Sequence, residues 1–122
     1  METLLVTNPV VDTPFALYNL PNEMPSLDVL GGKSPRHGTV PPKGLVTYSA
    51  YFQEEQTVQV WAAGLGDIDL HIYDRFGMPV VSDTDEGGLP CVTWTPIGSG
   101  EFQIKLVNNT KRPVEYALYT SV

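Results

Sequence analysis

The segment from residue 66 to residue 74 alternates apolar and polar side chains, and this pattern restricts the fold more than any other feature of the chain. Its apolar positions are two residues apart and hold Ile68, Leu70 and Ile72. A period of two is that of a β-strand with one face against a hydrophobic core and the other face away from it. The segment therefore predicts a half-buried strand.

The same alternation recurs after Gly44, and 11 Gly and 11 Pro punctuate the short runs rich in Val, Ile, Thr and Tyr. Such runs, joined by short turns, are typical of an antiparallel sandwich or barrel. We predict one all-β domain, a jelly-roll-like antiparallel β-sandwich of about seven to nine strands. The alternation places twelve residues in its core: Val58, Val60, Ile68, Leu70, Ile72, Val92, Trp94, Phe102, Ile104, Leu106, Tyr116 and Leu118.

Residues 1–43 differ in composition from the rest, because five prolines within the first 40 residues forbid a long helix and interrupt any central strand. We expect an irregular segment with one or two short strands, packed on a sandwich formed by residues 44–122. An interdomain linker is the alternative. The apolar residues of this segment favour packing over disorder: Leu4, Val6, Val10, Phe15 and Leu17.

The formal net charge of −7 argues against two classes of partner. Nucleic acid and anionic membrane surfaces would both be repelled, so we expect neither as a partner. The sequence also contains no segment long enough to span a membrane. Solubility is one explanation of the acidity, and bound cations are the other.

Carboxylates are the best candidates for chemistry, and they cluster in and after the strand predicted at residues 66–74. They are Asp67, Asp69, Asp74, Asp83, Asp85 and Glu86. Calcium takes about six to eight oxygen ligands, which two acidic turns at one end of a sandwich could supply in part. The alternative is that Asp favours turns by bonding its own backbone. We favour that alternative and expect no cofactor and weak or no calcium binding, with Asp67, Asp69, Asp83 and Asp85 as ligands if the ion binds.

Four aromatic residues fall on the outward parity of their strands: Tyr51, Trp61, Tyr73 and Tyr119. Exposed aromatic rings can stack on sugars or on peptide side chains. Trp61 and Tyr73 are therefore the candidate binding residues. The alternative, which we favour, is that residues 1–40 cover an aromatic face.

Three further features have ordinary structural interpretations. We expect the single cysteine, Cys91, to be a buried inert thiol. His71 is expected to be a solvent-facing or hydrogen-bonded structural residue. Asn108-Asn109-Thr110 fits a glycosylation acceptor but is more simply a hairpin turn.

The two histidines and the serines form no recognisable hydrolase motif with a nucleophile, which predicts that the chain is not an enzyme.

The motif order from Thr57 onward resembles the bacterial pre-peptidase C-terminal domain over roughly residues 44–122. Its parts are Thr57-Val58-Gln59-Val60, the run from Gly66 to Asp74, Gly77, Ser82-Asp83-Thr84-Asp85, the segment from Gly100 to Asn108 and Tyr116-Ala117-Leu118. The resemblance implies a non-catalytic accessory module of an exported protein, in an extracellular or periplasmic location. Its partner would be a neighbouring catalytic domain or an extracellular polymer. The alternative is a stand-alone structural or adhesive subunit that assembles through sheet edges or an aromatic face.

Overall fold

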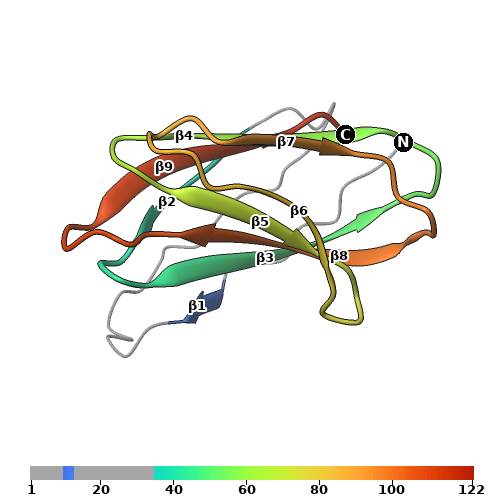
Figure 1. Cartoon of the computed structure of the whole chain (residues 1–122), viewed down its shortest axis with the longest axis horizontal. Helices are drawn as coiled ribbons and strands as arrows, with labels where there is room; N and C mark the ends of the chain where they lie inside the picture. The colour runs from blue at the N-terminus through green and yellow to red at the C-terminus, as the bar shows by residue number, and fades with distance from the viewer. Residues whose placement is uncertain (1–9, 13–34) are drawn as a thin grey trace.

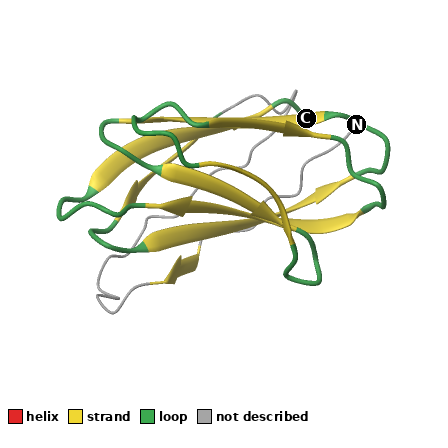
Figure 2. Ribbon diagram, viewed as in Figure 1, coloured by secondary structure: helices red, strands yellow, loops and turns green. Residues whose placement is uncertain are grey.

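The computed structural model describes residues 10–12 and 35–122, and this part of the chain is all-β, without a helix (Figure 2). Short extended runs bounded by turns give nine strands. They are β1 (Val10–Asp12), β2 (Arg36–Val40), β3 (Leu45–Phe52), β4 (Val58–Gly64), β5 (Asp69–Tyr73), β6 (Pro79–Asp83), β7 (Cys91–Trp94), β8 (Gly100–Val107) and β9 (Val114–Thr120). No helix within the described ranges is long and apolar enough to cross a membrane.

The strands form two antiparallel sheets stacked face to face (Figure 1). One sheet has the order β1-β3-β8-β5-β6 and the other the order β2-β9-β4-β7. From β2 onward, early strands pair with late ones in a nested series: β2 with β9, β3 with β8, β4 with β7 and β5 with β6. This double-sheet arrangement is that of a jelly roll, and it confirms the predicted fold class.

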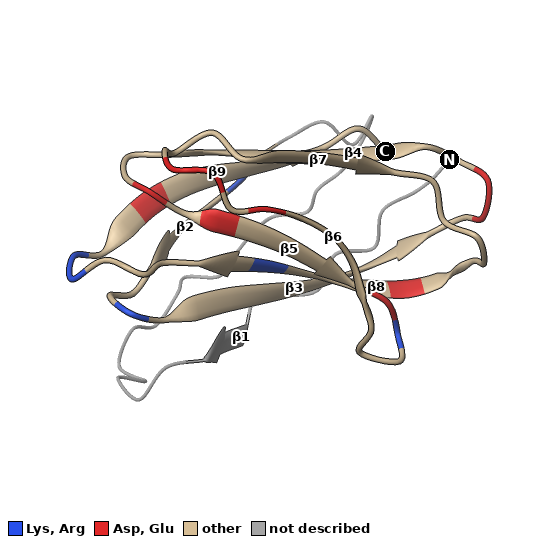
Figure 3. Ribbon diagram, in the orientation of Figure 1, with Lys and Arg blue, Asp and Glu red and all other residues tan. Residues whose placement is uncertain are grey.

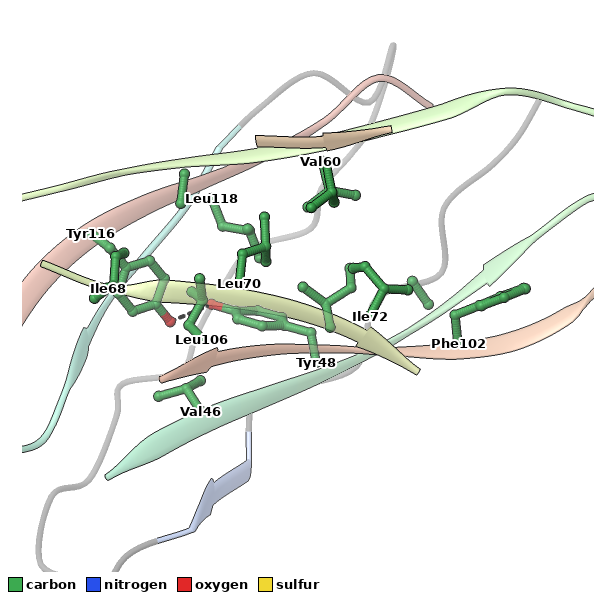
Figure 4. Close-up of a cluster of buried hydrophobic side chains, with 14 of the residues drawn as sticks. Val46, Tyr48, Val60, Ile68, Leu70, Ile72, Phe102, Leu106, Tyr116 and Leu118 are labelled. Carbon is green, nitrogen blue, oxygen red and sulfur yellow. Dashed lines mark hydrogen bonds between the residues drawn. The ribbon is translucent and has the colours of Figure 1, made fainter. Parts of the chain in front are cut away.

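The core lies between the inner faces of the two sheets (Figure 4). All twelve residues predicted from the alternation are buried, and Leu70, Ile72 and Ile104 are fully so. Strand β3 adds a further row of inward side chains, which holds Val46, Tyr48, Ala50 and Phe52. The period-two pattern was therefore sufficient to assign the buried face of each central strand.

Two tyrosines join the sheets through the core. The hydroxyls of Tyr48 on β3 and Tyr116 on β9 are 2.7 Å apart and share a hydrogen bond, drawn as a dashed line in Figure 4. Burial raises the pKa of both phenols above 10.0. Gly38 on β2 leaves room for the ring of Tyr116, because a Cβ at that position would lie 2.6 Å from the Tyr116 hydroxyl.

Two of the described strands fall within residues 1–43. Strand β1 pairs with β3 at the edge of the five-stranded sheet, and β2 pairs with β9 along its whole length. Val40 of β2 is fully buried, so this strand contributes to the core. The remaining apolar residues expected to pack there, Leu4, Val6, Phe15 and Leu17, lie outside the described residues.

Candidate functional site

Asp67, Asp69 and Asp83 lie around one end of the sandwich, where several carboxylates cap loop backbone, whereas Asp74 lies in the β5–β6 turn at the other end. Asp67 Oδ1 accepts a hydrogen bond from the Gly87 amide at 2.9 Å. Asp83 accepts two, from the Asp85 amide at 3.0 Å and from the Cys91 amide at 2.9 Å. Carboxylates bound in this way hold the loop after β6 in place, which is the structural role expected of Asp in turns.

The surroundings of Asp69 disfavour its charged form. Partial burial and the nearby charges of Asp67 and Asp83 raise its pKa, while His71 opposes the shift. Its Oδ2 accepts a hydrogen bond from Asn109 Nδ2 at 3.2 Å. Within the described ranges, no three His, Cys, Asp or Glu side chains form a group that could hold a metal ion. Calcium binding by Asp67, Asp69, Asp83 and Asp85 stays a prediction.

Gly87 and Gly88 allow the loop after β6 to pack against the end of β4. The Gly64 amide donates to the Gly88 carbonyl at 2.6 Å, and the Ile68 amide donates to the Gly87 carbonyl at 3.2 Å. A Cβ at Gly88 would collide with the backbone carbonyls of Gly64 and Gly66. The second glycine of this pair is therefore required by a close approach of two backbones.

The four outward aromatic residues do not form one face. Trp61 on β4 and Tyr119 on β9 are cross-strand partners on the four-stranded sheet, with rings 5.3 Å apart and 2° from parallel. Tyr51 on β3 and Tyr73 on β5 belong to the five-stranded sheet. The two candidate binding residues, Trp61 and Tyr73, thus lie on opposite outer surfaces of the sandwich.

Tyr73 is part of a polar row on the five-stranded sheet. The ring of His71 stacks against it with centroids 6.3 Å apart, and Lys105 Nζ lies 5.7 Å from its centroid. His71 is half-buried on this outward face. The Lys105 ammonium therefore lies within cation–π distance of the Tyr73 ring.

The prediction that Cys91 is buried is wrong. Cys91 is exposed, because Val92 and Trp94 take the inward positions of β7 and leave the thiol on the outer face. It lies opposite Trp61 in the strand pairing, and its sulfur accepts a hydrogen bond from Gln59 Nε2 at 3.4 Å. The parity of β7 was sufficient to predict this exposure.

Asn108 is fully buried, so the glycosylation motif Asn108-Asn109-Thr110 is inaccessible in the folded chain. Its Nδ2 lies within hydrogen-bond distance of three carbonyls, at 3.1 Å from Val40, 3.2 Å from Pro41 and 2.7 Å from Arg112. Its Oδ1 accepts hydrogen bonds from the amide and the hydroxyl of Thr110. The side chain therefore fastens two loops to the end of β8.

The sequence did not reveal a groove at the opposite end of the sandwich, which lies towards the right of Figure 1. It runs between the β5–β6 turn and the β7–β8 loop and has a volume of about 280 Å³. Phe76 is 75% exposed and Ile97 is 96% exposed, both on its rim, and the Trp94 indole lies in its wall. The signal that could have found it is an apolar residue within each turn, in Arg75-Phe76-Gly77 and Pro96-Ile97-Gly98.

In comparisons with known proteins, no family model matches the chain and no curated protein matches it.

Proposed function

We propose that the chain is a non-catalytic accessory module of an exported bacterial protein, in which residues 44–122 carry the motifs of the pre-peptidase C-terminal type. The support is the motif order from Thr57 to Leu118 together with a jelly-roll fold. Its location would be extracellular or periplasmic. The module would hold a neighbouring catalytic domain or a polymer substrate, without carrying out chemistry itself.

The observation that carries this proposal is that acidic side chains accept hydrogen bonds from the backbone of loops. Asp67 and Asp83 accept hydrogen bonds from loop amides, and Asp74 Oδ1 accepts two more from Phe76 and Met78 at 2.9 Å each. A general acid or base must instead lie free beside a reacting group. These carboxylates support loop structure and favour a binding module over an enzyme.

Polymer targeting is tested by retention on insoluble collagen, chitin, cellulose and peptidoglycan. We expect retention on one of them to be lost in Trp61→Ala or in Tyr73→Ala, because aromatic rings stack on sugars and on peptide side chains. Leu65→Ala is the matched control, since Leu65 is 84% exposed and lies in a loop. Absence of retention on all four polymers would remove the targeting version of the proposal.

Calcium gives a separate prediction. We expect millimolar calcium to change the melting temperature little relative to chelator, because an ion that binds only the folded state stabilises it by mass action. A large rise that disappears in Asp69→Asn would instead show a calcium site around Asp67, Asp69, Asp83 and Asp85. The control is Glu115→Gln, which removes an exposed carboxylate on β9.

The alternative function is a structural or adhesive subunit that assembles through sheet edges. Strands β6 and β7 end their sheets on the same side of the sandwich, and Val80 on β6 is 37% exposed. An outer strand is a template for pairing with another chain. A concentration-dependent dimer in sedimentation, combined with no polymer retention, would favour this alternative.

A further inference from the structure

We propose that the groove between the β5–β6 turn and the β7–β8 loop binds an extended peptide segment of a partner protein, one that combines apolar with basic side chains. The inference rests on the proposed accessory function and names the chemistry of the partner. Three properties of the groove support it: its apolar rim, the commitment of its polar groups and the charge around it.

The rim of the groove is apolar and exposed. Phe76 and Ile97 stand on the two facing turns, and Val80 follows on β6. Turns are ordinarily polar, so large apolar side chains at both tips form a surface that gains free energy when a partner covers it. The volume of about 280 Å³ is below the range of typical small-molecule sites and suits one or two side chains of a partner.

Most of the polar side chains around the groove are already engaged. Thr95 Oγ1 shares a hydrogen bond with Thr57 Oγ1 at 2.8 Å, and Ser99 Oγ accepts from the Glu54 amide at 2.8 Å. Asp74 Oδ1 caps its own turn, and the Arg75 guanidinium lies 4.8 Å from the Phe76 ring centroid. A sugar requires many hydrogen-bond partners, so this lining favours apolar peptide side chains.

Figure 3 shows acidic segments on the ribbon at this end of the sandwich, and this charge favours a basic partner. Asp74 and Glu101 line it. Glu54 and Glu55 stand on a turn whose amides donate to Ser99 and Pro96 of the β7–β8 loop. Among the described residues that line the groove, Arg75 is the one cation that opposes these four carboxylates. Lysine or arginine beside the apolar side chains of a partner would complement this charge, whereas a second copy of the same face would be repelled.

Trp94 lines the groove and can report on its occupancy. The residue is 9% exposed, and its Nε1–H is enclosed by protein, with no acceptor among the described residues. Because this N–H is closed to solvent, it does not bond the partner, and its NMR resonance reports contact with the groove wall.

The test uses the ¹⁵N-labelled full chain and a short synthetic peptide in which Leu and Phe alternate with Lys and Arg. We expect binding to shift the indole N–H resonance of Trp94 and not that of Trp61, which lies on the outer face of the four-stranded sheet. A peptide with Glu in place of Lys and Arg should bind more weakly, as should one with Ser in place of Leu and Phe. Equal binding of all three, or of none, would overturn the proposal.

Groove variants complete the test. Ile97→Ser and Phe76→Ser should each weaken binding about tenfold. Both residues are exposed on the rim, so the variants should fold normally but lose an apolar contact with the peptide. Leu65→Ser, an equally exposed change at the other end of the sandwich, should leave the affinity unchanged. Unchanged affinity in Ile97→Ser would overturn the peptide groove. If that variant instead loses retention on an insoluble polymer, the groove binds polymer, and the accessory function stands while this proposal fails.

Discussion

At the scale of single residues, the most consequential side chain outside the apolar core is Asn108. It is fully buried, and its amide reaches the carbonyls of Val40, Pro41 and Arg112. The Val40 carbonyl ends β2, the Pro41 carbonyl lies in the connection before β3, and the Arg112 carbonyl lies in the connection before β9. One side chain at the end of β8 therefore holds strands of both sheets in register.

Asn108→Ala should lower the free energy of unfolding by about 1–3 kcal/mol, because buried carbonyls lose their donor. Asn109→Ala is the matched control, since Asn109 is the exposed neighbour and, among the described residues, its side chain bonds only that of Asp69. We expect that control to change stability by less than about 1 kcal/mol. The measurement is urea unfolding of both variants, and equal losses would contradict the role assigned to Asn108.

Residue roles that depend on strand parity could be predicted, and those that depend on distant loops could not. Parity gave the burial of Leu70 and Trp94, and applied to β7 it would also have given the exposure of Cys91. Asn108 was interpreted as a turn residue because Asn favours turns locally. Its burial depends on carbonyls about 68 positions earlier in the chain, which no local pattern contains.

At the scale of elements, side chains on the inner face of a strand contribute much more to the free energy of unfolding than those on its outer face. Leu70 on β5 is fully buried, whereas Gln103 on β8 faces outward and is half-buried. Leu70→Ala should cost about 2–5 kcal/mol, through lost burial and the cavity that remains. Gln103→Ala should cost less than about 1 kcal/mol. Equal melting temperatures for the two variants would show that the inner face is assigned wrongly.

The connection between β6 and β7 depends on backbone contact with the end of β4. Gly88→Ala should be strongly destabilising, by about 2 kcal/mol or more, because its Cβ would collide with fixed backbone and not with a flexible side chain. Gly98→Ala is the control, since a Cβ there meets nothing within 4 Å. Thermal unfolding compares the two, and a melting temperature for Gly88→Ala equal to that of Gly98→Ala would exclude the close approach.

At the scale of the whole molecule, the two ends of the sandwich differ in how far the sequence predicted them. At the acidic end, Asp67 and Asp83 lie near Asp69, whereas Asp74, which the sequence places in the same group, lies in the turn at the other end. The groove at the other end is built from the turn at 74–78 and the loop at 95–99. These turns meet only because the two sheets stack, so local patterns contain no information about the groove.

The stacking of the sheets also predicts how the molecule responds to alkaline pH. Burial raises the pKa of Tyr48 and of Tyr116 above the value of 10.0 expected in the unfolded chain. Below pH 10 both phenols are protonated in the folded and in the unfolded chain, so their titration does not reduce the free energy of unfolding. Above it the unfolded chain loses protons first, so stability falls as pH rises, by up to about 1.4 kcal/mol per pH unit for each proton.

Removing both hydroxyls separates this titration from the packing of the rings. The double variant Tyr48→Phe, Tyr116→Phe should keep most of its stability near neutral pH, because neither hydroxyl is left without its partner. It should also lose stability less steeply above pH 10. The single variant Tyr116→Phe should be less stable than the double variant at neutral pH, since the Tyr48 hydroxyl then stays buried alone. Urea unfolding across the alkaline range measures both effects, and a double variant as sensitive to alkali as the original chain would show that other groups control this unfolding.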